Sequence, residues 1–526
     1  MSSIFEIISI SILIPLLNNF FNEPNSKLSF NFFGIENLFN SMSNKSLVII
    51  FIIVYVVKIL YLIVNVFFQN YLNQTFVNSL VNKLAFVYVN QNIDFHSKNS
   101  PSFLFKNLRT ETAYAGQIFS SITMIMSDLI LIITVSACLL VINYKILILS
   151  FLVILPFSLI YISIAKKTNR DFSSIRNEVD KDINRHIFEN FTGIKELIYF
   201  QNKEFFTRKI YKNLNLQRRY NSYTYTLSQS TKYYIEFILI IILAVVYTYY
   251  LLTGLQLAQL FSSLAVFLMA SVRILPIIAR IQGNFQTYDF YKSSIELIAK
   301  DLSFYKLNRE NEICFENFES IEGHNLSFKY GKKIIFEDFN FKITKDLITI
   351  IHGPSGNGKS TLLDLISGNR KFISGNLIIN NIDISNKSFR FNRIAFMSQK
   401  PFVFRGSISD NICFGREYNY NHLKNAIKES GVSKFITSND YENLMIEENG
   451  SNYSVGQIQR ITLARSLYGN PSVIIMDEPT SAIDHENVES FIKTIESLSL
   501  KIKIIIVTHD NSIIEKFIRQ ELININ

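Results

Sequence analysis

Residues 353–361 of this 526-residue chain read Gly353-Pro354-Ser355-Gly356-Asn357-Gly358-Lys359-Ser360-Thr361. The stretch matches the phosphate-binding pattern G-x-x-x-x-G-K-[ST] at every fixed position. Glycines permit the backbone conformations that turn successive N–H groups inward around a polyanion, and the helix that follows presents its positive end to the phosphates. The pattern therefore predicts a nucleotide-binding loop, in which Lys359 reaches the β and γ phosphates and Ser360 holds Mg²⁺ through its hydroxyl.

The sequence on either side of this loop supports the prediction. Residues 347–351 (LITII) have the pattern of a short apolar strand, and residues 361–367 (TLLDLIS) that of a helix with an apolar face. A chance glycine turn is the alternative, and it would not require a strand before it and a helix after it. Taken alone, the loop is compatible with a kinase, a GTPase or a motor.

The composition indicates that part of the chain faces lipid. Hydrophobic residues make up 48% and charged residues 18%, whereas an average soluble protein has roughly 25% charged residues. The net charge of +9 is compatible with nucleic acid binding, but the basic residues lie in loops beside apolar segments, as in membrane proteins, so no nucleic acid partner is expected. Cys138, Cys314 and Cys413 lack metal-ligand spacing and are expected to be reduced.

Six apolar stretches approach the length of roughly 20 residues that a bilayer crossing needs. The first has neither the basic region nor the cleavage site of a signal peptide, so it is expected to stay as a membrane segment. Basic residues are dense in 166–219 and sparse in 22–45, which places the long loops and everything after residue 281 in the cytoplasm. The predicted helices are about residues 4–21, 46–68, 119–142, 146–165, 235–252 and 256–281.

The chain is predicted to contain two domains. The long loops 69–118 and 166–232 carry amphipathic sequence and are expected to prolong the membrane helices. Strand-like runs then alternate with helical stretches at 377–379, 393–396, 473–476 and 504–507. We therefore expect an N-terminal all-α, six-helix transmembrane domain (1–300) and a C-terminal α/β P-loop NTPase domain (315–526) with a largely parallel sheet.

Two carboxylates, Asp477 and Glu478, end the apolar run 473–476. The carboxyl edge of a parallel sheet is where α/β folds place their chemistry. Asp477 suits the shell of a Mg²⁺ ion, and Glu478 suits a general base that orients or deprotonates the attacking water. An ordinary acidic pair at a strand end is the alternative, and the phosphate loop favours the catalytic interpretation.

The order and spacing of further motifs resemble the nucleotide-binding domain of ATP-binding cassette (ABC) transporters. Residues 452–460 (NYSVGQIQR) resemble the family signature LSGGQ-x-QR and lie just before the strand of Asp477, as in that family. The resemblance implies that Ser454, Gly456 and Gln457 contact the γ phosphate of ATP bound by a second subunit. Val455 replaces the first glycine of the signature, and function is expected to survive this change with an altered rate of turnover.

Single residues match three more positions of the family. Gln399 resembles the glutamine that touches Mg²⁺ and the nucleophilic water, and His509 resembles the switch histidine that contacts the γ phosphate. Tyr330 stands where the family stacks an aromatic ring on adenine, although an ordinary packing aromatic is also compatible with the sequence. His352 departs from the family, which mostly has a small or apolar residue there, and no role follows for it from the resemblance.

One membrane half fused to one cassette looks like an exporter-type half transporter, for which a homodimer with two ATP sites is the simplest assembly. Residues 272–281 (VRILPIIARI) and 288–294 (YDFYKSS) are similar to the sixth-helix region of bacterial flippases of lipid-linked oligosaccharides. The loop tips near 93–105 and 193–208 resemble coupling helices. The resemblance implies a multi-pass protein of the bacterial inner (plasma) membrane with its cassette in the cytoplasm.

The expected function is ATP-driven export or flipping of a substrate, with ATP and Mg²⁺ as cofactors. The expected partners are a second half transporter, membrane lipid and the transported substrate. A lipid-linked oligosaccharide or related lipid is the first candidate cargo, and an exporter of peptide, drug or simple lipid would carry the same cassette. A nucleotide-gated membrane regulator without productive ATP turnover is the alternative from another class, and the intact Glu478 and His509 oppose it.

Charged residues within the apolar spans are the sequence clue to cargo, because charge is costly there and often functional. They are Lys58, Asp128, Glu236 and Arg273. Arg273 is the candidate substrate residue, since a guanidinium facing a cavity could hold a pyrophosphate head group. Pairing of Arg273 with Asp128 or Glu236, or extension of its side chain to the membrane interface, is equally compatible with the sequence.

Overall fold

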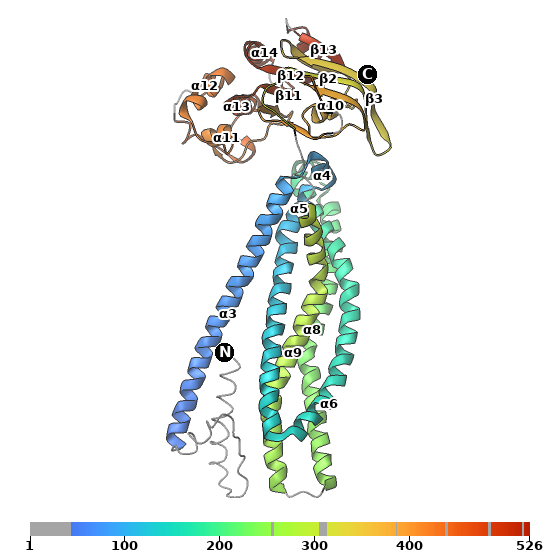
Figure 1. The fold of residues 1–526 in the computed structure, drawn as a ribbon, viewed down its shortest axis with the longest axis vertical. Coiled ribbons are helices and arrows are strands. Elements are labelled where there is room, and N and C mark those ends of the chain that lie inside the picture. Colours follow the sequence, from blue (N-terminus) through green and yellow to red (C-terminus); the bar gives the residue numbers. More distant parts are fainter. Residues whose placement is uncertain are drawn as a thin grey trace. The chain divides into compact units, whose positions relative to one another are not determined.

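The chain folds into two compact units. A computed structural model describes residues 44–253, 257–304, 313–384, 387–436, 440–481, 485–517 and 520–525. One unit comprises Met1–Gln91 and His96–Asn308, and the other comprises Asn92–Phe95 and Arg309–Asn526 (Figure 1). We refer to them as the helical unit and the cassette unit and describe each by itself.

The described N-terminal part of the chain consists of helices joined by short connections. The predicted spans 46–68 and 235–252 lie inside longer helices, and most of 256–281 does as well. The expected extension of helices into the loops is confirmed, since α3 continues to Val89. The predicted helix 4–21 lies outside the described residues. In chain order the helices are α3 (Asn44–Val89), α4 (Ile93–Lys98), α5 (Pro101–Lys106), the π-helix η1 (Asn107–Glu111), α6 (Thr112–Thr192), α7 (Ile194–Tyr199), α8 (Lys203–Thr253) and α9 (Leu257–Ser303).

The predicted helices 119–142 and 146–165 form a single helical run, α6, rather than two helices with a break between them. Residues 143–145 contain neither glycine nor proline, the residues that most often end a helix. In Figure 1, α6 reverses its direction at the lower end of the helical unit, near the label α6. The expected outer connection is therefore a bend within helical sequence.

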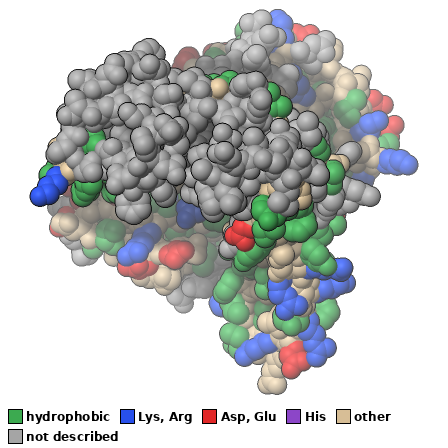
Figure 2. All heavy atoms as spheres, turned by 90° about the horizontal axis from the view of Figure 1, so that it is seen from below, with side chains coloured by type: hydrophobic (Ala, Val, Ile, Leu, Met, Phe, Trp, Pro, Cys, Tyr) green, Lys and Arg blue, Asp and Glu red, His purple; other side chains and the backbone are tan. Residues whose placement is uncertain are grey.

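Among the described residues, two helices are long and apolar enough to cross a membrane, as judged by length and composition: Lys45–Val89 and Pro101–Ala137. Large hydrophobic side chains are exposed along much of α3; Phe67, for example, has 72% of its surface accessible. Figure 2 shows hydrophobic side chains alongside basic and acidic ones on the described part of this face. The count of six crossings stays a prediction.

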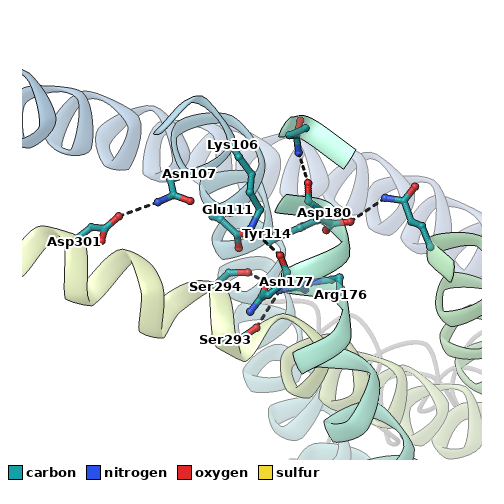
Figure 3. A network of polar contacts seen from close by, with 12 residues as sticks. Lys106, Asn107, Glu111, Tyr114, Arg176, Asn177, Asp180, Ser293, Ser294 and Asp301 are labelled. Atoms are coloured by element: carbon teal, nitrogen blue, oxygen red, sulfur yellow. Dashed lines mark hydrogen bonds and ion pairs between the residues drawn. The ribbon is translucent and has the colours of Figure 1, made fainter. Parts of the chain in front are cut away.

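A buried polar network joins the helices of this unit (Figure 3). Arg176 of α6 is only 1% exposed. Its guanidinium donates to the carbonyl oxygen of Phe290 and to the hydroxyl of Ser294 in α9, both at 3.0 Å. The rings of Tyr114 and Tyr291 lie on it, with centroids 4.7 and 4.9 Å away. Arg176 therefore fixes α6 against α9.

One turn further along α6, the buried carboxylate of Asp180 makes the corresponding contacts with α8. It accepts hydrogen bonds from the Tyr220 hydroxyl at 2.7 Å and the Gln217 amide at 3.0 Å. No ion pair joins Asp180 to Arg176 in the described part of the chain. Each charge is held by neutral groups of a different neighbouring helix, so the pair ties three helices together.

The cassette unit is built on two sheets. A five-stranded parallel sheet has the order β13-β4-β12-β11-β8, and a four-stranded antiparallel sheet has the order β3-β2-β5-β6. The strands are β1 (Ile313–Phe315), β2 (Ser320–Tyr330), β3 (Lys333–Thr344), β4 (Ile348–His352), β5 (Ser374–Ile379), β6 (Ile382–Asp383), β7 (Phe389–Phe391), β8 (Ile394–Met397), β9 (Gly406–Ser407), β10 (Met445–Ile446), β11 (Val473–Asp477), β12 (Lys503–Thr508) and β13 (Gln520–Asn524).

Helices cover the parallel sheet. They are α10 (Lys359–Ile366), α11 (Ile408–Cys413), α12 (Tyr420–Ser430), the 3₁₀ turns η3 (Val432–Lys434) and η4 (Glu448–Gly450), α13 (Val455–Tyr468), α14 (His485–Ser499) and α15 (Asn511–Ile514). Successive residues of β11 enter different cores: Ile474 packs with residues of α12 to α14, whereas Ile475 packs with α10 and the antiparallel sheet. Burial on both faces explains the continuous apolar runs of these strands.

The predicted strand at 377–379 forms, as part of β5, but it belongs to the antiparallel sheet. The runs 393–396, 473–476 and 504–507 lie in β8, β11 and β12 of the parallel sheet, and 347–351 lies in β4. The largely parallel sheet is therefore confirmed for the strands that carry the site.

Candidate nucleotide-binding site

The phosphate loop connects β4 to α10, as its pattern requires. Gly358 has φ +100°, and a Cβ there would lie 2.4 Å from Cγ2 of Ile335, so only glycine fits. Lys359 is 7% exposed, and its ammonium donates to the carbonyl oxygens of Gly353 at 2.7 Å and Pro354 at 2.9 Å. The loop thus holds a buried ammonium group whose partners are neutral carbonyl groups of the loop itself. Its positive charge is not neutralised by these partners, so the loop suits the binding of a polyanion.

Three predicted residues meet at the carboxyl edge of the parallel sheet. One carboxylate oxygen of Glu478, Oε1, lies 2.6 Å from Nδ1 of His509, and the other, Oε2, accepts from Nε2 of Gln399 at 2.7 Å. A carboxylate only accepts, so His509 carries its proton on Nδ1 in this arrangement, and its Nε2 is left for another partner. Glu478 adopts φ +46°, an uncommon left-handed conformation for glutamate.

Asp477, the last residue of β11, lies beside Ser360 at the start of α10. Burial raises the pKa of the Asp477 carboxyl above its ordinary value, the charge of Glu478 raises it further, and a hydrogen bond with Ser360 lowers it. A half-buried carboxylate beside a hydroxyl is a donor set that suits Mg²⁺, which prefers hard oxygen ligands. A cation at this place would also stabilise the charged form of Asp477.

Tyr330 ends β2, and its ring is 41% exposed. The guanidinium of Arg370 lies over the ring, 5.0 Å from its centroid. Arg370 also pairs with Asp364 at 2.8 Å and with Asp94, which belongs to the segment Asn92–Phe95 of the cassette unit. One face of the aromatic ring is therefore covered by a cation, and an adenine would stack on the other face. Sequence reasoning missed Arg370.

The signature residues lie at the start of α13. Ser454 is the N-cap: its hydroxyl accepts from the backbone N–H of Gln457 at 3.3 Å, and the Gln457 side chain accepts from the N–H of Ser454 at 2.9 Å. A Cβ on Gly456 would meet no atom within 4 Å. In the described part of the chain, no hydrogen bond joins these residues to the phosphate loop, so the structure does not bring them together with Lys359.

Two arginines hold α13 in place: Arg460, the last residue of the signature segment, and Arg465, which no motif marks. Arg465 donates to the carbonyl oxygens of Asn411 and Phe402, both at 2.7 Å. Burial, followed by the charge of Arg416, lowers the pKa of Arg465 to about 10. Arg460 donates to the carbonyl oxygen of Ser430 at 3.1 Å. These contacts fix the signature helix to neighbouring segments that no motif marks.

The predicted substrate residue Arg273 lies in α9, but its side chain is outside the described residues. Asp128, a possible partner of Arg273, binds Arg280, which lies seven residues after Arg273 in α9. Nε and Nη2 of Arg280 lie 3.2 and 2.7 Å from the two carboxylate oxygens of Asp128. Glu236 is exposed, and Lys58 is buried beside the ring of Tyr55.

Comparison with known proteins agrees with this geometry. Residues 336–481 match the ABC transporter family, and residues 2–272, more than half of the chain, match the ABC transporter transmembrane region. The chain therefore belongs to the ABC transporter family and is a membrane protein. A solved structure described as a bacterial Atm1-family ABC exporter with ATP bound aligns over 99% of this chain and 92% of its own, with TM-score 0.77 and 14% identity, which establishes the exporter fold.

Curated relatives match over less than two fifths of this chain. A sublancin-168-processing and transport ATP-binding protein of Bacillus subtilis is 32% identical over 39% of this chain and 29% of its own length. An ATP-dependent lipid A-core flippase of Desulfotalea psychrophila is 34% identical over 38% of this chain and 35% of its own length. A phosphate import ATP-binding protein of Thermotoga maritima is 35% identical over 36% of this chain and 80% of its own length. The matched part thus spans about a third of the first two relatives.

Proposed function

We propose that this protein is one half of an ATP-driven exporter that works as a homodimer and flips a lipid-linked oligosaccharide or a related lipid. ATP hydrolysis in its cassette would drive the transport. Family membership and the exporter fold support the class of activity. The observation that carries the hydrolytic role is the convergence of Gln399 and His509 on the carboxylate of Glu478.

At the site, each side chain has a proposed task. Residues of the phosphate loop, Gly353 to Thr361, bind the phosphates, and Lys359 turns its buried ammonium toward them. Ser360, Asp477 and Gln399 would hold Mg²⁺, which neutralises phosphate charge when bound. Glu478 accepts the proton of the attacking water, while His509 and Gln399 fix the orientation of its carboxylate. Tyr330 stacks on adenine.

A second copy of the chain would complete each site. Ser454 and Gln457 make no hydrogen bond to the phosphate loop of their own chain within the described residues, and they lie at an exposed helix start. In the proposed dimer they would contact the nucleotide bound by the partner, as the family resemblance suggests. Two equivalent composite sites, related by a twofold axis, follow from this arrangement.

The loop tips are proposed to transmit the motion of the cassette. Short helices α4 and α7 lie where coupling helices are expected. The second tip is strongly apolar and exposed: Phe191, Tyr199 and Phe200 have 73%, 83% and 76% of their surface accessible. Side chains of this kind are rarely left in water and suit insertion into a groove of a cassette.

The cargo proposal rests on Arg280 and on the resemblance of 272–281 to flippases. Asp128 is 4% exposed and occupies Nε and Nη2 of Arg280, whose side chain is 52% exposed. Among the described residues no other hydrogen bond engages this guanidinium, so its remaining N–H donors could bind an anionic head group, and Arg273 lies seven residues earlier on α9. The flippase and the peptide-processing relative support a lipid and a peptide cargo respectively.

Reconstitution into proteoliposomes tests the proposal. The full-length protein, supplied with Mg-ATP and a fluorescent lipid-linked sugar, should move the label between leaflets, and a short labelled peptide inside parallel vesicles should stay in place. Arg280→Gln should lower lipid flipping while the basal ATPase rate is kept. If the protein hydrolysed ATP and moved the peptide but not the lipid, the cargo would be a peptide rather than a lipid. Absence of ATP hydrolysis would refute the proposed function.

A further inference from the structure

His352 is a residue to which neither the family resemblance nor the proposed function gives a task. It is the last residue of β4 and directly precedes Gly353, the first residue of the phosphate loop. It also stands at the centre of three neighbouring strands, because it is paired in register with Thr508 of β12 on one side and Asn524 of β13 on the other.

The imidazole of His352 is bound to the neighbouring strand. Its Nδ1 lies 3.2 Å from the carbonyl oxygen of Thr508. A carbonyl oxygen only accepts, so Nδ1 carries the proton and donates it. The backbone of the same residue faces the other strand, since its carbonyl oxygen accepts from the N–H of Ile525 at 2.8 Å. His352 thus connects β12 and β13 at the end of the sheet where the phosphate loop begins.

Thr508 leads directly into the predicted switch residue His509. The hydroxyl of Thr508 accepts from the N–H of Asp510 at 3.1 Å, and its carbonyl is the group held by His352. The hydroxyl and the carbonyl group of Thr508, the residue just before His509, are therefore both hydrogen-bonded. That ring reaches Glu478 at 2.6 Å, a distance at which small displacements of the backbone weaken the hydrogen bond.

We propose that His352 is a positioning residue for ATP hydrolysis, which acts by fixing the Thr508 carbonyl and with it the orientation of His509 toward Glu478. The inference rests on the proposed hydrolytic function. A small or apolar side chain at position 352 cannot donate to this carbonyl, so the switch segment would keep only its strand contacts. His352 touches neither Glu478 nor His509, and its effect passes through the backbone of Thr508.

The test compares three variants of the full-length protein by Mg-ATP turnover and thermal melting. His352→Val removes the donor while keeping a strand-forming side chain, and kcat should fall about fivefold, as loss of one hydrogen bond predicts. The KM for ATP should stay within about twofold, since no phosphate contact is lost. His352→Asn places an amide N–H at the position of Nδ1 and should restore turnover. His352→Gln carries the same amide one carbon further out and should not.

Exposed His324 of β2, which is 54% accessible, provides the control: His324→Val should leave turnover unchanged. Wild-type kcat in His352→Val, or equal losses in His352→Asn and His352→Val with unchanged melting, would overturn the inference and leave the proposed function intact. Losses of kcat that follow melting temperature in all variants would also overturn it, because they indicate a structural role only. If His352→Val does not fold, the difference between the Asn and Gln variants decides. A wild-type protein that hydrolyses no ATP would instead refute the proposed function itself.

Discussion

Replacing Glu478 by glutamine tests the proposed chemistry with little disturbance of the fold. The two oxygens of the carboxylate face different donors, Nδ1 of His509 at 2.6 Å and Nε2 of Gln399 at 2.7 Å. In Glu478→Gln the amide oxygen can keep the His509 contact, and the new NH₂ group can face Gln399. Gln399 can turn its own amide so that oxygen replaces nitrogen, which restores a donor–acceptor pair. The resting geometry should therefore survive.

The activity should not survive, because an amide cannot accept the proton of the attacking water at neutral pH. A general base contributes roughly 10²- to 10⁴-fold to the rate, which corresponds to about 2.7–5.5 kcal/mol of activation free energy. We expect kcat for ATP hydrolysis to fall by that factor. Binding of a fluorescent ATP analogue and the melting temperature should stay near those of the wild type.

Phosphate release by the full-length protein in Mg-ATP measures the effect. Glu429→Gln is the matched control, since Glu429 pairs with Lys501 at 3.0 Å on the cassette surface, and exposed pairs contribute little to stability. Turnover of Glu478→Gln within about threefold of the wild type would refute the assignment of Glu478 as the base. Loss of turnover together with loss of ATP binding would also refute it, because the carboxylate would then serve binding rather than chemistry.

Three further predictions concern other parts of the molecule. Burial raises the pKa of Asp477, so the nucleotide-free protein loses stability as the pH rises through that pKa. Asp477→Asn should therefore have a higher melting temperature than the wild type at neutral pH, and the difference should vanish below about pH 4. The variant should also lose Mg²⁺-dependent turnover. Arg176→Met should lower the free energy of unfolding by about 3 kcal/mol in thermal melts, whereas Arg208→Met, at an 80% exposed site, should change it by under about 0.5 kcal/mol; equal shifts would contradict the role of the buried network. Gly456→Ala should melt like the wild type, since its Cβ has room within the chain, yet hydrolyse ATP more slowly if the partner nucleotide lies there; wild-type turnover would exclude that contact.

The residues of the nucleotide site could be predicted from the sequence because each belongs to a short, continuous motif. The phosphate loop is a continuous motif, and Asp477, Glu478 and His509 each follow a run of apolar residues that the structure confirms as β11 or β12. Parallel strands buried on both faces produce such runs, and their carboxyl ends meet at one edge. The motif spacing therefore predicted which side chains come together, even though their exact contacts had to come from the structure.

The contacts that position these residues could not be predicted from the sequence, because they join distant parts of the chain. Arg176 and Ser294 are separated by 118 positions, and no motif spacing predicts that they meet. Arg370 reaches Tyr330 from beyond the end of α10, and Arg465 depends on carbonyl groups of an irregular segment. The antiparallel sheet was missed for a similar reason, since β2 pairs with β5 across the whole phosphate loop. Only tertiary packing brings these groups together.

The signature segment is a continuous motif, and its local geometry explains how it could serve the proposed nucleotide site of a second copy. The capping interaction uses the hydroxyl oxygen of Ser454 and the amide oxygen of Gln457 as acceptors. Within the described parts of the chain, two donors of these residues have no acceptor: the hydroxyl hydrogen of Ser454 and the NH₂ group of Gln457. Donors at the start of a helix suit a phosphate, and the helix dipole adds to the attraction. Val455 keeps its backbone N–H and adds only an apolar side chain, 46% exposed. The departure from the family glycine therefore removes no phosphate-binding donor, and any effect on turnover would arise from bulk at the interface between two copies.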